Sequence, residues 1–82
     1  MGGIVEQSIR AGNCLGQNIR KARLAKKLTQ EQLATRLQLL GCDMSRGTYA
    51  KIEMGIRHIT VPEIDAIKEI LDMEYEDFFA QD

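Results

Sequence analysis

The sequence of 82 residues predicts an all-α fold, a compact bundle of four to five short helices. Apolar residues recur about every three to four positions along most of the chain, as the buried face of a helix requires. Ser, Thr and Gly stand where such helices begin and end. No segment alternates apolar and polar residues in the manner of a strand. The length suits one domain with a modest core.

The first twelve residues differ from the rest. They contain three glycines together with Ile4, Val5 and Ile9, and these apolar residues follow no clear period. We therefore expect residues 1–12 to form a mobile or weakly structured N-terminal arm, or else a short added helix.

The first amphipathic helix is expected to begin at Asn13, which can serve as an N-cap. Leu15, Ile19 and Ala22 then recur at helical spacing, and the basic side chains between them fall elsewhere on the helix. We expect this helix to end near Lys27.

The segment LTQEQLATRLQLLG has the clearest start and stop signals in the chain. Thr29 and Gln32 are spaced as a capping box, and Leu28 and Leu33 are spaced as a hydrophobic staple. Gly41 can take the left-handed conformation that ends a helix. These signals predict a second helix over about 30–40.

The stretch SRGTYAKIEMG predicts a third helix over 45–54, which Ser45 caps and Gly55 closes. At about 100° per residue the helix has two different faces. One carries residues suited to packing, namely Thr48, Tyr49, Ile52 and Glu53. The other has two cations around small residues: Arg46, Gly47, Ala50, Lys51 and Met54. The second face is low enough for the close approach of a partner.

A fourth helix is expected after TVPE, where Thr60 is the cap, Pro62 lies in the first turn and Glu63 completes a capping box. A last short helix over about 75–79 closes the bundle. We expect Phe79 to belong to the core.

Charge is divided unevenly along a chain whose net charge is −1. Residues 1–58 hold ten of the eleven Lys and Arg and only four acids, whereas residues 59–82 hold Lys68 and eight acids. A basic half that meets a polyanion and an acidic half that faces away would suit nucleic-acid binding. The alternative is a chance division over two solvated faces.

Several classes of function receive no support from the sequence. No apolar run is long enough to span a bilayer and no secretory signal is visible, which favours a cytoplasmic protein without membrane contact. Cys14 and Cys42 are read as packing residues, and His58 is a lone histidine without a catalytic or metal-binding partner. We expect no enzyme, because no nucleophile with a base or carboxylate pair is visible. Neither a cofactor, a metal nor a small-molecule effector is indicated.

The segments IRKARLAKKLTQEQLA, SRGTYAKIEMG and LDMEYEDFF, in this order, resemble the Cro and lambda-repressor type of helix-turn-helix domain. The resemblance runs from Leu15 to Phe79. It implies a helix-turn-helix DNA-binding domain over residues 13–82, with five helices and with helix 45–54 in the major groove of double-stranded DNA.

Two departures from the family pattern stand out. Seven residues, QLLGCDM, separate Leu37 from Ser45, where the family usually has two, so the second helix and the link are both expected to be longer. Gly47 replaces the polar side chain that the family more often directs at the groove.

Four residues are predicted to face the bases: Arg46, Gly47, Ala50 and Lys51. Gly47 and Ala50 permit close approach, and Arg46 can offer a two-nitrogen fork to a guanine. Lys51 can reach either a base or a phosphate. Alternatively, both cations are ordinary solvated charges.

Phosphate contacts are expected around this helix. The resemblance places Gln30 on a phosphate at the positive end of the second helix, where it can also steady the base of the third. Thr48, Arg57 and His58 are the further phosphate candidates.

The resemblance also implies a structural ion pair between Arg23 and Glu53. For a homodimer, Tyr75 and Phe78 are the expected contacts, with the N-terminal arm as the second choice. The alternative is that both aromatic rings belong to the core. The function expected is a sequence-specific transcriptional regulator, homodimeric on a partly palindromic operator. The alternative is a protein-interaction module on the same fold, such as an antitoxin-like or anti-repressor component, with Met54, Tyr75 and the N-terminal apolar residues in its interface.

Overall fold

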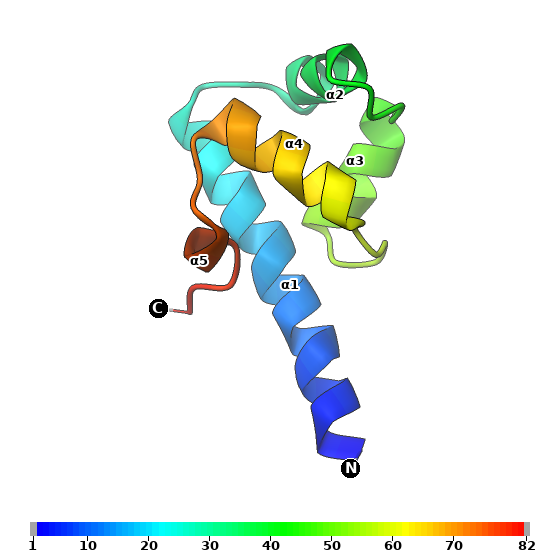
Figure 1. The fold of residues 1–82 in the computed structure, drawn as a ribbon, viewed down its shortest axis with the longest axis vertical. Helices are drawn as coiled ribbons and strands as arrows, with labels where there is room; N and C mark the ends of the chain where they lie inside the picture. Colours follow the sequence, from blue (N-terminus) through cyan, green and yellow to red (C-terminus); the bar gives the residue numbers. More distant parts are fainter. Residues whose placement is uncertain (1, 82) are drawn as a thin grey trace.

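A computed structural model of the protein describes the backbone of residues 2–81 and the side chains of residues 14–81. Within these residues the chain is all-helical (Figure 1). The helices are α1 (Gly2–Ala25), α2 (Gln30–Leu39), α3 (Arg46–Glu53), α4 (Val61–Leu71) and α5 (Tyr75–Phe78).

Helix α1 begins before the expected position. Asn13 lies inside it, so the expectation that Asn13 caps the first helix is wrong. Nothing between Gly2 and Asn13 stops a helix, because the glycines there weaken helix formation by only about 1 kcal/mol each and no proline intervenes. Residues 2–12, expected as a mobile arm or a short added helix, continue α1 beyond the rest of the bundle (Figure 1). Their mobility stays a prediction, and their side chains lie outside the described residues.

Local capping explains where α2 and α4 begin. The Thr29 side chain accepts a hydrogen bond from the Gln32 N–H at 3.0 Å, and Gln32 Oε1 accepts one from the Thr29 N–H at 2.9 Å. Thr60 and Glu63 form the same capping box before α4. These contacts satisfy N–H groups that the first turn of a helix leaves without a partner.

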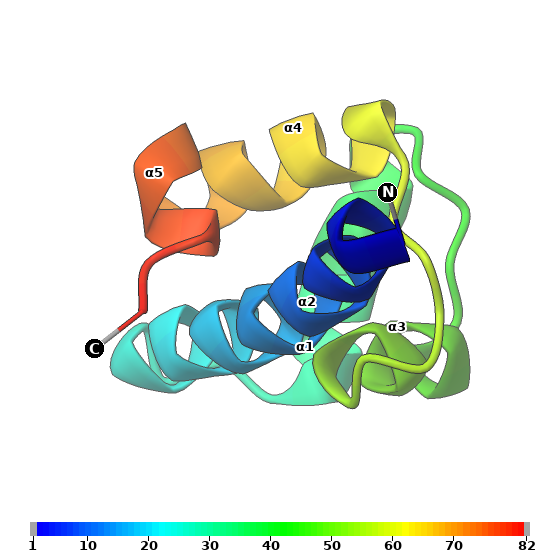
Figure 2. The ribbon, with the colours of Figure 1, turned by 90° about the horizontal axis from the view of Figure 1, so that it is seen from below.

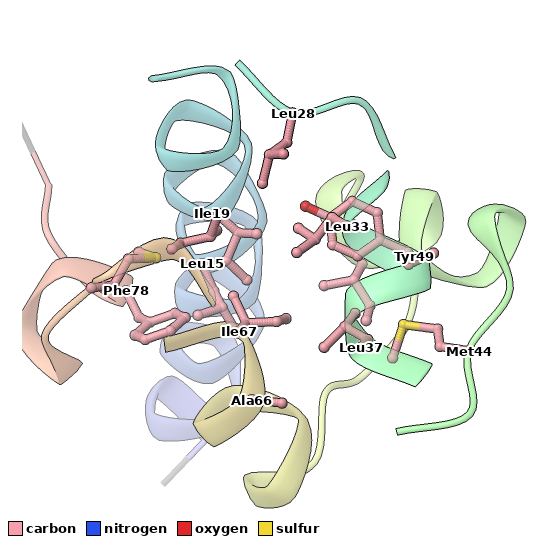
Figure 3. Close-up of a cluster of buried hydrophobic side chains, with 14 residues drawn as sticks. Leu15, Ile19, Leu28, Leu33, Leu37, Met44, Tyr49, Ala66, Ile67 and Phe78 are labelled. Atoms are coloured by element: carbon pink, nitrogen blue, oxygen red, sulfur yellow. The ribbon is translucent and has the colours of Figure 1, made fainter. Parts of the chain in front are cut away.

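The bundle is centred on α1. This helix contacts α3, α4 and α5, while α2 contacts α3 and α4. Figure 2 shows α3 and α4 on opposite sides of α1. The core between the helices contains one contiguous cluster of buried apolar side chains (Figure 3). Its members are Leu15, Ile19, Leu28, Leu33, Ala34, Leu37, Met44, Tyr49, Ile52, Ala66, Ile67, Leu71, Met73 and Phe78.

The C-terminal segment is tied back onto α1. Asn18 Nδ2 donates hydrogen bonds to the Phe78 carbonyl at 2.9 Å and to the Ala80 carbonyl at 2.8 Å. Phe78 is fully buried beside α1, whereas Phe79 is half exposed. The expectation that Phe79 belongs to the core is therefore wrong. A helix of four residues can bury only one side, and the side that meets α1 carries Phe78.

Candidate nucleic-acid interface

Helix α3 is short, and residues at both of its ends define where it starts and stops. The Ser45 side chain accepts a hydrogen bond from the Thr48 N–H at 3.1 Å, which caps the first turn. Gly55, with φ of 77°, ends the helix in a conformation that glycine adopts without strain. Between these ends the side chains of Tyr49, Ile52 and Glu53 are buried.

The opposite face of α3 is open to solvent. Arg46, Gly47 and Lys51 are exposed, and Ala50 is half-buried. The nearest heavy atom to a methyl group added at Gly47 would be Ser45 Oγ, at 4.0 Å. Among the side chains that the structure describes, neither Arg46 nor Lys51 has a hydrogen-bond or ion-pair partner. Of the four residues predicted to read bases, Gly47 and Ala50 therefore form a low surface, and Arg46 and Lys51 are the cations that flank it.

A buried polar network holds the packed face of α3. Arg23 of α1 contacts the Glu53 carboxylate with two nitrogens, Nε at 2.6 Å and Nη2 at 3.1 Å, and its Nη1 donates to the Leu28 carbonyl at 2.7 Å. The Tyr49 hydroxyl donates to the same carboxylate. Every buried side-chain nitrogen or oxygen among the described residues has a partner. The network therefore links α1, the start of α2 and the end of α3 without an unsatisfied charge.

Protonation of this network follows from its contacts. Burial alone would raise the pKa of the Glu53 carboxyl, but hydrogen bonds from Arg23, Tyr49 and Gln30 outweigh burial and lower it. The pKa of the Tyr49 hydroxyl is raised by burial and by its bond to Glu53. At neutral pH, Glu53 is therefore ionised and Tyr49 remains a donor.

Gln30 lies at the first position of α2, beside this network. Its Nε2 donates to Glu53 Oε1 at 3.0 Å. The side-chain amide is thus engaged inside the protein, and it joins the start of α2 to the end of α3. The first N–H groups of α2 are the part of this region suited to a phosphate.

The remaining phosphate candidates differ in availability. Thr48 is half-buried and its hydroxyl is bonded to Ser45 Oγ at 3.1 Å, whereas His58 is exposed. The Arg57 guanidinium forms a two-nitrogen contact with Glu63, at 3.0 Å and 3.1 Å, which lowers the pKa of that carboxyl. Arg57 therefore stabilises the link before α4. Because Glu63 already neutralises much of its charge, Arg57 is less available to a phosphate.

The two expected dimer contacts differ in exposure to solvent. Tyr75 is half exposed, with its hydroxyl donating to Asp65 Oδ1 at 2.5 Å and Lys68 Nζ lying 5.1 Å from its ring centroid. Phe78 is fully buried within its own chain. The expectation that Phe78 contacts a second copy is wrong, because its ring is part of the core.

Gly16, at the crossing of α1 and α3, was missed in the sequence. A methyl group added there would lie 2.5 Å from the Ile52 carbonyl oxygen and 2.6 Å from that of Glu53. The one available signal was a glycine inside an otherwise regular helix, two turns before Arg23 and on the same face.

Metal-ligand clusters and membrane-spanning helices are both absent from the described residues. No three His, Cys, Asp or Glu side chains among them gather as metal ligands would. No helix in the described part of the chain is both long and apolar enough to cross a membrane.

Comparison with known proteins agrees with this geometry. A family model described as helix-turn-helix matches residues 19–78, which include α2 to α5 and the last two turns of α1. Neither the curated proteins nor the solved structures provide a significant match. The match covers most of the chain, and the chain therefore belongs to the helix-turn-helix family of DNA-binding domains, of the Cro and lambda-repressor type.

Proposed function

We propose that the protein is a sequence-specific transcriptional regulator that inserts α3 into the major groove of double-stranded DNA and acts as a homodimer on a partly palindromic operator. One observation carries this proposal. The exposed face of α3 is low at Gly47 and Ala50, and it is flanked by Arg46 and Lys51, which have no partner among the described side chains.

The chemistry of the two cations suits a groove. Arg46 is the first residue of α3, and its guanidinium can donate two hydrogen bonds to O6 and N7 of one guanine. Lys51 lies near the other end and can neutralise a phosphate or reach a base acceptor. The low surface between them allows the helix to come close enough for both contacts.

Phosphate contacts would fix the orientation of α3. The free N–H groups at the start of α2 form one candidate site, and Thr48, His58 and the exposed part of Arg57 form another. The acidic residues of 59–82 would face away from the DNA, because a polyanion repels them.

A homodimer would read two half-sites about 34 Å apart, which compensates for a short reading helix. After the burial of Phe78, Tyr75 is the remaining C-terminal candidate for the contact between copies. The N-terminal turns of α1 are the second candidate.

A protein-interaction module is the competing function. The segment from the end of α3 to the first residue of α4 exposes three apolar side chains: Met54 at 62%, Ile56 at 69% and Val61 at 70%. Apolar groups exposed to this extent favour contact with a protein.

Selection of bound duplexes from a random-sequence pool separates the two functions. We expect the wild type to enrich a partly palindromic sequence, and the double variant Arg46→Ala/Lys51→Ala to lose that enrichment while staying folded. Arg20→Ala/Arg36→Ala is the matched control, because it removes two exposed positive charges outside α3 that have no partner among the described side chains. Equal binding of all duplexes by the wild type and both variants would favour the interaction module.

A further inference from the structure

The closest approach between α1 and α3 occurs at Gly16. A methyl group added at this position would lie 2.5 Å from the Ile52 carbonyl oxygen, whereas ordinary contacts begin at 3.4 Å. The obstructing atoms belong to the backbone, so no side-chain rotation can make room. Any residue larger than glycine therefore requires the two helices to separate by about 0.9 Å.

The same face of α1 makes a second contact with the same part of α3. Arg23 follows Gly16 by seven residues, which is about two helical turns, so both lie on one stripe of α1. Gly16 faces the Glu53 carbonyl and Arg23 binds the Glu53 carboxylate. Glu53, the last residue of α3, is thus held at its backbone and at its side chain.

We propose that Gly16 is a positioning residue for DNA recognition, which sets how far the C-terminal end of α3 stands from α1 and so directs Arg46 and Lys51. This inference rests on the proposed function. Helix α3 has only eight residues and moves as one rigid element, so a shift of about 0.9 Å at Glu53 is carried to Arg46 as well as to Lys51.

Such a shift affects the two kinds of DNA contact differently. A two-nitrogen contact with a base tolerates a misplacement of only about 0.5 Å. A long side chain on a phosphate adapts, because a point charge needs no fixed geometry. Gly16 is therefore expected to influence specificity more than overall affinity.

The experiment compares Gly16→Ala with the wild type on the selected duplex and on an unrelated duplex. We expect affinity for the selected duplex to fall about tenfold or more, as for one lost base contact, and affinity for the unrelated duplex to change by less than about twofold. Amide resonances of α3 should shift in the ¹H–¹⁵N spectrum of the free variant. If Gly16→Ala folds and keeps the wild-type ratio of affinities for the selected and the unrelated duplex, the inference is wrong.

Two further variants keep the result interpretable. Ile67→Val removes one methyl group from the core at α4, so it lowers stability and should leave the affinity ratio unchanged. If Gly16→Ala does not fold, Arg23→Lys tests the other contact with Glu53, since lysine keeps the charge and loses the two-nitrogen fork. An unchanged ratio in folded Arg23→Lys would then overturn the inference.

The proposed function and this inference can fail separately. A wild type that prefers no duplex would contradict the proposed function. The positioning of α3 would then be judged by the amide resonances of free Gly16→Ala, and unshifted α3 resonances would overturn it.

Discussion

Gln30 Nε2 lies 3.0 Å from Glu53 Oε1, and this bond connects the first residue of α2 with the last residue of α3. The residue expected on a phosphate is therefore bonded inside the domain. The Gln30 amide, Arg23 and Tyr49 all donate hydrogen bonds to the Glu53 carboxylate. The angle between the two helices of the DNA-binding unit thus depends on a polar contact as well as on apolar packing.

Replacement of Gln30 by alanine should lower the free energy of unfolding by about 1 kcal/mol, because Glu53 loses one of its donors in a part-buried site. Thermal melts measure this effect. Gln17→Ala is the control, since Gln17 is an exposed glutamine in α1. Unchanged stability together with weaker binding to every duplex would place the amide on a phosphate instead.

Acid should weaken the domain through Glu53. The folded-state pKa of this carboxyl is lowered, since the hydrogen bonds from Arg23, Tyr49 and Gln30 outweigh burial, which alone would raise it. Its contribution to stability is therefore present above the ordinary value of 4.5 and is lost as pH falls through the folded-state pKa.

Urea unfolding at several pH values tests this linkage. We expect the stability difference between wild type and Glu53→Gln to be constant above about pH 5 and to shrink at lower pH. Glu69→Gln, which removes an exposed carboxylate from α4, is the control. A difference that stays the same down to pH 3 would contradict the role assigned to Glu53.

Replacement of Arg46 and replacement of Lys51 should affect DNA affinity in different ways. Arg46→Ala is expected to cost about 1 to 3 kcal/mol on the selected duplex and much less on unrelated DNA, because a base contact carries sequence information. Lys51→Ala should weaken binding to all duplexes alike and reduce the slope of affinity against salt by about one. Titrations at several salt concentrations measure both effects. A sequence-dependent loss in Lys51→Ala would mean that Lys51 also touches a base.

Gly47 should respond to substitution in the opposite way from Gly16. A side chain at Gly47 meets open space, so Gly47→Ala should raise the free energy of unfolding by about 0.5 to 1 kcal/mol through its helix propensity. Gly47→Leu should be equally well folded yet bind DNA more weakly, since its bulk separates α3 from the groove. Melts and DNA titrations of both variants provide the comparison. Wild-type DNA affinity in Gly47→Leu would show that the low surface has no role in binding.

Lys27 adopts a left-handed backbone conformation, with φ of 59°, just after the end of α1. This conformation costs a residue with a side chain about 1 to 2 kcal/mol, and glycine adopts it freely. Lys27→Gly should therefore raise the stability by about 1 kcal/mol in urea unfolding. Lys27→Ala separates conformation from charge, because alanine keeps the strained backbone. An equal gain in both variants would assign the effect to the lost charge.

The parts of the fold that were predictable from sequence depend on contacts between near neighbours. Thr29, Ser45 and Thr60 each bind an N–H three residues further along, so their caps could be read directly from the sequence. The start of α1 could not be read in this way. The sequence there contains weak helix formers and no stop signal, and Asn13 offered a cap that the helix does not use.

The parts that were not predictable depend on distant segments. Gly16 matters because of two carbonyl groups 36 and 37 residues later in the chain, which no local pattern shows. The contact of Gln30 with the end of α3 agrees with the expectation that this residue steadies the third helix, but that expectation came from the family resemblance and not from a local pattern. Phe78 and Phe79 are adjacent in a helix too short to show a period, so the choice of which ring is buried depends on the position of α1.

The two bonds from Asn18 to the carbonyls of Phe78 and Ala80 span about sixty residues and bring the last helix onto the first. Helices α2 and α3, by contrast, are connected by a short link and pack on each other. Contacts between distant parts of a chain require a large loss of chain entropy before they form. The closure of α5 on α1 would accordingly come late in folding, and the C-terminal segment would be the first to open in the native state. Amides of α5 would then exchange with solvent before those of α2 and α3, although Phe78 is among the most deeply buried residues of the protein.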